Sequence, residues 1–174
     1  MTELPQRLAA RVNMGMGIGR QTNEIDESKN TPTMQVALPG GEVRSEIPFV
    51  QQYGFASKPE PGSDVITHFQ AGDRSRGVAI ASNDQRHRPK TLKAGEVCIY
   101  DKKGTTILLK EDGSIEITPG NKKVVIKGSV EIDGSVHVTG SIQADGDIKA
   151  GNISLKHHIH SKGDKGSPTG SPIS

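Results

Sequence analysis

Three histidines, His157, His158 and His160, stand close together after Lys156 near the end of the sequence. On an extended strand His158 and His160 lie on one face and His157 on the other, because successive side chains alternate. Imidazole nitrogen binds iron, nickel, copper and zinc. Two ligands per chain become six in a threefold assembly, and six-coordination favours iron or nickel over tetrahedral zinc. The spacing therefore predicts a metal site at His158 and His160, with a solvated histidine cluster as the alternative.

A repeat of six residues precedes these histidines and would position them. Each unit begins with glycine, and apolar residues follow at its third and fifth positions. The glycines are Gly128, Gly134, Gly140 and Gly146, and the apolar pairs are Val130 with Ile132, Val136 with Val138, Ile142 with Ala144, and Ile148 with Ala150. A spacing of two places each pair on one face of a short strand, and glycine permits a tight bend between strands. The repeat is typical of a β-helix.

This repeat is too short to bury its own apolar stripe. A single-chain β-helix uses three hexads per coil, so these units supply about one and a half coils, whereas a solenoid needs several stacked layers. Other copies of the chain must then cover the stripe. We predict that three identical chains wind around one axis.

The first hundred residues have a different pattern. Apolar residues alternate over 34–38 and 43–49, which predicts a hairpin, and over 65–69, 77–81 and 97–100. Five short strands in about 80 residues fit an oligonucleotide/oligosaccharide-binding (OB) barrel over residues 21–100. The five aromatic residues also lie between residues 49 and 100 and are expected to form its core.

The barrel is flanked by three further segments. Residues 1–20 combine a short helix, expected at residues 4–12, with three alternating glycines between Met14 and Gly19; together they are expected to dock onto a neighbouring protein. Residues 101–160 continue with strands near residues 107–109 and 115–117 and then the repeat, and form the predicted trimeric spike. Residues 161–174 are rich in Gly, Ser and Pro and form a tail.

The order of these parts resembles a known family. The barrel, the glycine-punctuated repeat, His158-Ile159-His160 and the later Thr169-Gly170-Ser171-Pro172 resemble the baseplate spike proteins of contractile-tailed phages. These are called baseplate assembly protein V in Mu-like phages and have relatives in contractile bacteriocins. The resemblance implies an all-β homotrimer, with an N-terminal OB-fold-like barrel followed by a C-terminal intertwined triangular β-helix. Ser171 departs from the family's usual pair of prolines after Thr-Gly.

The resemblance also implies partners and ions. One iron ion per trimer is held at the tip by the paired histidines of three chains, which here match His158 and His160, and some members hold calcium and chloride. A baseplate hub protein and the tail tube lie above the spike, and contraction drives it through the host outer membrane. The expected location is the virion tail baseplate or a bacteriocin particle, after assembly in the host bacterial cytoplasm.

Other functions find less support in the sequence. The formal net charge of +2 is spread along the chain, which argues against a nucleic-acid or lipid surface. An oligonucleotide/oligosaccharide-binding module would need aromatic platforms, and its basic stretch, from Arg74 to Lys93, is expected to be a solvated loop. A trimeric hexapeptide-repeat acyltransferase would need more hexads. His68 and His87 belong to no catalytic motif, and we expect no enzyme. Cys98, the only cysteine, cannot form a disulfide within one chain, and no apolar run is long enough to span a bilayer.

Overall fold

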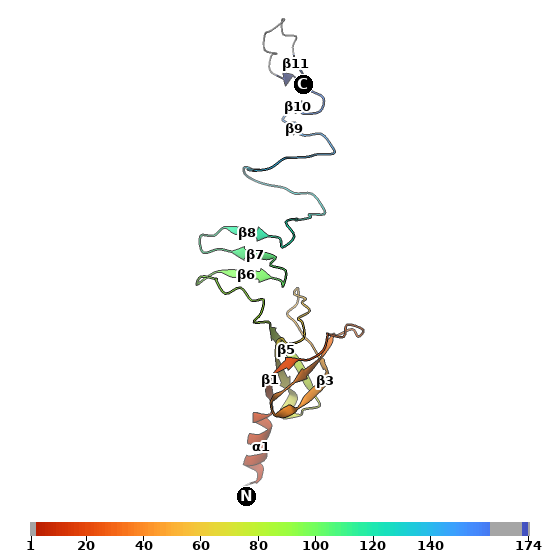
Figure 1. Cartoon of the computed structure of the whole chain (residues 1–174), viewed down its shortest axis with the longest axis vertical. Coiled ribbons are helices and arrows are strands. Elements are labelled where there is room, and N and C mark those ends of the chain that lie inside the picture. Colours follow the sequence, from red (N-terminus) through yellow and green to blue (C-terminus); the bar gives the residue numbers. More distant parts are fainter. Residues whose placement is uncertain (1–2, 161–171, 174) are drawn as a thin grey trace. The chain divides into compact units, whose positions relative to one another are not determined.

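The computed structural model describes residues 3–160 and 172–173. The chain divides into two compact units, Met1–Val125 and Ile126–Ser174. The first unit contains one helix, a five-stranded sheet and a three-stranded sheet (Figure 1). Among the described residues, no helix is both long and apolar enough to cross a membrane.

The helix α1 (Glu3–Asn13) forms where the sequence predicts it and leaves an apolar stripe open. Leu4, Leu8 and Val12 repeat every four residues and are all exposed. The end of the helix packs against the short 3-10 turn η2 (Gln70–Gly72). A Cβ at Gly72 would lie 2.4 Å from the carbonyl oxygen of Arg11, so only glycine fits beneath the helix.

Five antiparallel strands form a curled sheet in the order β3-β2-β1-β4-β5. They are β1 (Met16–Gln21), β2 (Thr33–Ala37), β3 (Val43–Pro48), β4 (Asp64–Phe69) and β5 (Gly77–Asn83). A 3-10 turn, η1 (Pro39–Gly41), joins β2 to β3. The two edges approach each other where Phe49 forms a bridge to Ala79 and Val50 N donates to Ala79 O at 2.9 Å. This half-barrel agrees with the predicted OB-like domain.

The core lies inside this curled sheet and follows the alternation of the strands. Its nine buried apolar residues are Ile25, Met34, Val36, Leu38, Ile47, Phe49, Val65, Phe69 and Ala79. The prediction that all five aromatic residues form the core is wrong. Phe49 and Phe69 are buried, but Tyr53 and Phe55 are exposed and Tyr100 is partly so. The core is filled mainly by aliphatic side chains, so the remaining aromatics stay outside it.

The glycines expected in an adaptable docking segment instead form the central strand β1. Gly17 and Gly19 face the core, while Met16 and Ile18 face outward. A Cβ at Gly19 would lie 2.4 Å from Ala37 O, so the strand and its neighbour approach too closely for a side chain. The sheet therefore begins at Met16, inside the segment predicted to dock.

The three-stranded sheet consists of β6 (Val97–Tyr100), β7 (Thr106–Leu109) and β8 (Ile115–Thr118), joined by tight turns. Asp101 Oδ1 accepts hydrogen bonds from Lys103 N at 2.7 Å and Thr105 N at 3.0 Å and so closes the first turn. The strands lie where the sequence predicts them. However, β6 pairs with β7 and not with the five-stranded sheet, so it was wrongly assigned to the barrel.

The second unit contains the hexad repeat but little paired structure. Within the described part of a single chain, residues 126–148 form no helix or strand. Short pairs follow: β9 (Lys149–Ala150) with β10 (Ile153–Ser154), and β11 (Ile159–His160) with β12 (Pro172–Ile173). The predicted β-helix is thus not formed by one chain, because its strands have no neighbour to complete a hydrogen-bonded ladder. It stays a prediction.

Candidate functional site

One face of the three-stranded sheet is entirely apolar and uncovered in a single chain. Val97 pairs with Leu109, which pairs with Ile115; Ile99 pairs with Ile107, which pairs with Ile117. Paired residues point to the same side, so these six side chains form one surface, here called the apolar sheet face. Their exposed fractions range from 37% to 66%. The opposite side of the sheet carries Cys98, Leu108 and the charged Glu116.

The hexad repeat exposes a second apolar surface, here called the repeat stripe. It consists of Val130, Ile132, Val136, Val138, Ile142 and Ile148, all exposed. In the described part of the chain, no backbone hydrogen bond joins residues 124–147 to other residues. Uncovered apolar side chains and unpaired amides therefore occur together on this segment.

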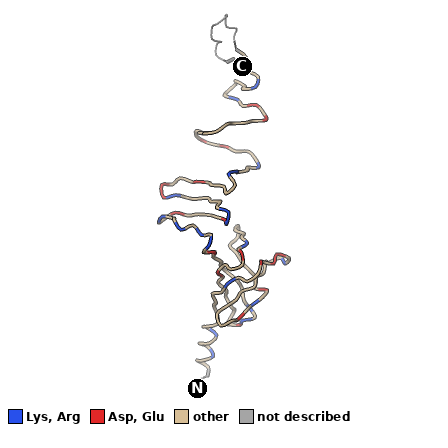
Figure 2. Tube along the Cα trace, in the orientation of Figure 1, with Lys and Arg blue, Asp and Glu red and all other residues tan. Residues whose placement is uncertain are grey.

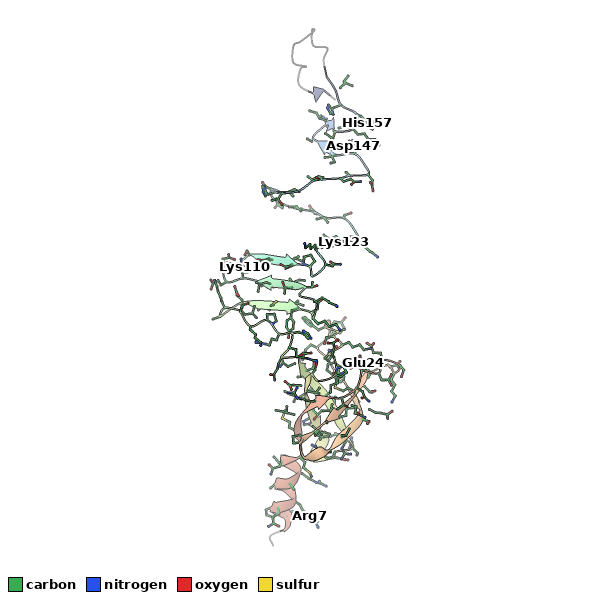
Figure 3. All side chains as sticks on the ribbon, viewed as in Figure 1. Arg7, Glu24, Lys110, Lys123, Asp147 and His157 are labelled. Carbon is green, nitrogen blue, oxygen red and sulfur yellow. The ribbon has the colours of Figure 1, made fainter. Side chains whose placement is uncertain are left out.

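The predicted metal ligands follow a turn. Asp147 Oδ1 accepts hydrogen bonds from Ser154 Oγ at 2.8 Å and from Lys156 N at 3.2 Å, which anchors the chain just before the histidines (Figure 3). The hydrogen bond from Ser154 is the main reason why the pKa of Asp147 is lowered. Residues 155–157 form a turn, so residues 157–160 are not one continuous strand as the alternation argument assumed. His157 belongs to the turn, and β11 begins only at Ile159.

His158 is half-buried and its ring is oriented by the backbone. Nδ1 lies 2.9 Å from Ser154 O and 3.0 Å from Leu155 O. Because a carbonyl oxygen only accepts, Nδ1 carries the proton and Nε2 carries the lone pair in the neutral ring. This arrangement, in which one ring nitrogen is held by a carbonyl, is typical of metal-bound histidine. His158 therefore fits the predicted role. The side chain of His160 lies outside the described residues, so its contribution stays a prediction.

A charged cluster that the sequence analysis missed joins two loops of the first unit. His87 Nε2 lies 3.7 Å from Glu60 Oε2 and 3.9 Å from Asp84 Oδ2. Such a trio could hold a metal ion. The spacing of Asp84 and His87 was visible in the sequence, but nothing there connected them with Glu60, which lies over twenty residues earlier.

The cations of the chain already neutralise this cluster. Arg86 binds Asp84 through both carboxylate oxygens, at 2.8 and 2.6 Å, and Lys102 binds Glu60. Ser63 Oγ also donates to Asp84 Oδ2 at 3.3 Å. The pKa of Asp84 is lowered chiefly by Arg86 and that of Glu60 chiefly by Lys102. We interpret the cluster as an ionic network that connects the loops, beside a cavity of about 610 Å³.

Three cations of the basic stretch between residues 74 and 93 are paired with carboxylates in a similar way. Arg74 binds Glu42 at 2.6 Å and lies 3.9 Å above the Phe69 ring, and Arg86 binds Asp84. Lys93 pairs with Glu111. Along the chain, positive and negative residues are interspersed (Figure 2). A nucleic-acid groove needs cations that are free to bind phosphates, so these three cations are less suited to it; the absence of such a groove stays a prediction.

Comparison with known proteins relates the five-stranded sheet to a phage family. Residues 21–86, which contain β2 to β5, match the family model described as Bacteriophage Mu Gp45, N-terminal. The baseplate puncturing device gp45 of Escherichia phage Mu is 33% identical over 96 residues, or 55% of this chain and 49% of that protein. The Mu-like prophage FluMu protein gp45 of Haemophilus influenzae is 29% identical over 89 residues, or 51% of this chain and 48% of that protein.

The chain thus spans about half the length of the curated relatives it matches. The family model covers strands β2 to β5, the ionic network up to Arg86 and the segment with the exposed Tyr53 and Phe55; it begins after most of β1 and stops before the three-stranded sheet and the repeat. The predicted resemblance to Mu-like baseplate spike proteins is confirmed: over strands β2 to β5 the chain is similar to the Mu Gp45 family.

Proposed function

We propose that this protein is a structural component of a phage tail baseplate, where three copies form the central spike that pierces the host outer membrane. Its relatives support the baseplate role, since one is named a baseplate puncturing device. The role is mechanical and not catalytic. The observation that carries the trimer is the apolar sheet face, which one chain leaves uncovered.

Burial of this face favours association. Fully burying one exposed Val or Ile side chain contributes roughly 1.5–3 kcal/mol, and the side chains here, which are already partly covered, contribute less. The apolar sheet face and the repeat stripe together present twelve such side chains (Leu109 included) per chain. Three chains arranged around one axis can cover one another's apolar faces. In such a closed cyclic assembly every copy makes the same contacts, so no copy is left with an uncovered face.

In this assembly the repeat becomes an intertwined triangular β-helix. The backbone amides of residues 124–147, which lack partners within one described chain, form ladders between chains. Interchain ladders leave few free strand edges, so the rod resists bending. The five-stranded sheet and α1 attach to the hub protein and tail tube, and the exposed Leu4, Leu8 and Val12 supply an apolar surface for this contact.

The tip is held by a metal ion. His158 and His160 of three chains supply six imidazoles to one transition ion, most suitably iron. When bound, the ion would link the three chain ends and prevent them from fraying. The orientation of His158 Nδ1 toward Ser154 O supports this role. Calcium and chloride, expected only from the family resemblance, have no assigned ligands here.

A charge on the repeat stripe tests the proposed assembly. Val136→Asp places three carboxylates on the axis, and burying unpaired charges costs several kcal/mol each. We expect the variant to sediment as dissociated or aggregated protein, whereas the parent sediments as a trimer. His137→Asp is the matched control, because the side chain of residue 137 faces away from the axis when that of residue 136 faces toward it. A parent chain that sediments as a monomer, or a Val136→Asp trimer as heat-resistant as the parent, would contradict the proposed spike.

A further inference from the structure

The two ends of the three-stranded sheet are each built from two segments of the chain. Because β6, β7 and β8 are antiparallel, the β6–β7 turn and the segment after β8 lie at one end. Gly120 N donates to Thr105 Oγ1 at 3.2 Å and joins these two segments. The segment before β6 and the β7–β8 turn lie at the other end, where Lys93 pairs with Glu111. Each end is therefore a defined surface.

The first end, here called the basic end, carries an excess of positive charge (blue in Figure 2). Its charged residues are Asp101, Lys102, Lys103, Lys122 and Lys123. Asp101 is used within the turn, where its Oδ1 accepts two backbone amides, and Lys102 is paired with Glu60. The other three lysines are exposed and form no ion pair with any described residue. The basic end therefore keeps three free ammonium groups.

The opposite end, here called the acidic end, has an excess of carboxylates. Its charged residues are Lys93, Glu96, Lys110, Glu111 and Asp112. Both of its lysines are already paired within the chain, since Lys93 binds Glu111 and Lys110 lies 3.8 Å from Glu116. Glu96 and Asp112 form no ion pair with the residues that the structure describes. The hydrogen bonds from Ser114 lower the pKa of Asp112, so its carboxylate is ionised at neutral pH.

One chain cannot bring these complementary ends together. Strands of four residues, about 13 Å long, separate them. Complementary patches at two different places on one molecule favour a head-to-tail contact between copies, and a ring closes when every copy makes the same contact. A phosphate-bearing partner would bind the basic end and leave the excess of carboxylates at the other end without a role. A second copy of the chain supplies partners for both ends.

We propose that the basic end of each chain pairs with the acidic end of the next copy. This inference rests on the proposed trimer and deepens it, because it names the polar contacts between neighbouring sheets. Lys103 and Lys123 of one copy would bind the carboxylates of Glu111 and Asp112 of the next. Charge pairs at an interface determine its register and exclude wrong pairings more than they add affinity. An apolar face carries no such direction, so the charged ends determine how neighbouring sheets align.

Zero-length cross-linking tests the contact without any substitution, because carbodiimide joins an ammonium group to a carboxylate that it touches. Isotope-labelled and unlabelled chains are denatured and refolded together, treated and digested. We expect cross-links from the lysines of the basic end to Glu111 or Asp112 that combine labelled with unlabelled peptides. The cross-link between Lys93 and Glu111 of one chain is the internal control. Sedimentation of the same sample establishes the oligomeric state.

These outcomes separate the contact from the proposed function. A parent chain that sediments as a monomer would refute the proposed trimer. A trimer in which the basic end forms no cross-link to the acidic end, or forms it only within one chain, would overturn the charged contact alone and leave the trimer in place.

A charge swap supplies a second, independent measurement. Lys123→Glu and Glu111→Lys should each raise the dissociation constant of the trimer several-fold, and the chain that carries both should return close to the parent. Within one chain these positions are too far apart to couple, so rescue arises only between copies. Lys90→Glu, the same change on an exposed loop, is the control and should have no effect. Added salt should reduce both single effects, because it screens exposed charges. Effects that simply add would show that the ends do not meet.

Discussion

At the scale of single residues, charged side chains make specific contacts around the five-stranded sheet. Glu42 receives hydrogen bonds from Arg74, at 2.6 and 3.1 Å, and from Arg44 at 2.5 Å. Arg74 also covers the ring of the buried Phe69. Glu42 thus links the segment between β2 and β3 to the turn before β5. The guanidinium of Arg74 covers one end of the core.

This contact predicts a specific dependence of stability on pH. The hydrogen bonds from Arg74 and then Arg44 lower the pKa of Glu42 from 4.5 to about 2. A lowered pKa in the folded state means that the stabilisation is complete above pH 4.5 and is lost as pH falls toward 2. Glu42→Gln should therefore lower the thermal midpoint at pH 7, and the difference from the parent should shrink between pH 4.5 and 2. Parallel melting curves across this range would contradict the assignment.

The tip histidines give a second prediction at this scale. Replacing both His158 and His160 with alanine should remove the transition ion and leave the trimer intact, because the repeat stripe holds the chains together. His157→Ala is the control; its ring is exposed. Elemental analysis of metal-replete protein should find about one ion per three chains in the parent. A double variant with unchanged metal content, or a parent trimer without metal, would rule out the proposed tip site.

At the scale of elements, the strand β1 shows how close approach of the backbone replaces side-chain packing. Its inward positions are Gly17, Gly19 and Gln21, and its outward positions carry the larger Met16 and Ile18. The neighbouring Val36 and Leu38 fill the space that the glycines leave. Thr67 Oγ1, from β4, donates to Gly17 O at 3.0 Å, so a side chain of the neighbouring strand supplies a hydrogen bond to the backbone that the glycine leaves uncovered.

Substitutions in β1 should therefore differ in cost. The Cβ of Gly19→Ala would meet the Ala37 carbonyl oxygen at 2.4 Å and Val36 Cγ1 at 2.7 Å, and the backbone cannot move without disturbing the sheet. We expect a loss of about 1–3 kcal/mol in the free energy of unfolding. Gly17→Ala should cost less, because its nearest neighbour at 2.8 Å is the end of the Leu38 side chain. Urea denaturation would measure both; equal losses would argue against a backbone clash at Gly19.

At the scale of the whole molecule, folding and assembly use different residues. The nine core residues lie between Ile25 and Ala79, all within the five-stranded sheet and its loops. The apolar sheet face and the repeat stripe contribute nothing to that core, so the proposed trimer depends on a separate set of side chains. The sheet domain can then fold before the chains associate.

Truncation tests this separation. Because β6 belongs to the three-stranded sheet, a fragment of residues 1–94 removes that sheet and the repeat together. We expect the fragment to unfold cooperatively, since its core is complete, and to sediment as a monomer. Analytical ultracentrifugation of the fragment and the full chain would measure this. A fragment as tightly trimeric as the full chain would show that the rod is not the element that trimerises.

Local patterns in the sequence predicted most of the elements and the chemistry of the tip. Alternating apolar residues located β2, β3, β4 and β5 and the three strands after residue 96, and spacing located α1. These signals are local, because a strand or helix shows its buried face within a few residues. The same alternation marked the repeat stripe as an interface, and His158 and His160 as ligands that remain to be tested.

Only the tertiary structure decided which surfaces meet. Gly17 and Gly19 form a central strand because of residues 36–38, and β6 leaves the barrel because its partner is β7. Tyr53 and Phe55 lie outside because aliphatic side chains and two other aromatics already fill the core. Glu60, Asp84 and His87 come together from two loops. Each outcome depends on distances between residues far apart in the chain, and a sequence pattern records only what a residue and its near neighbours prefer.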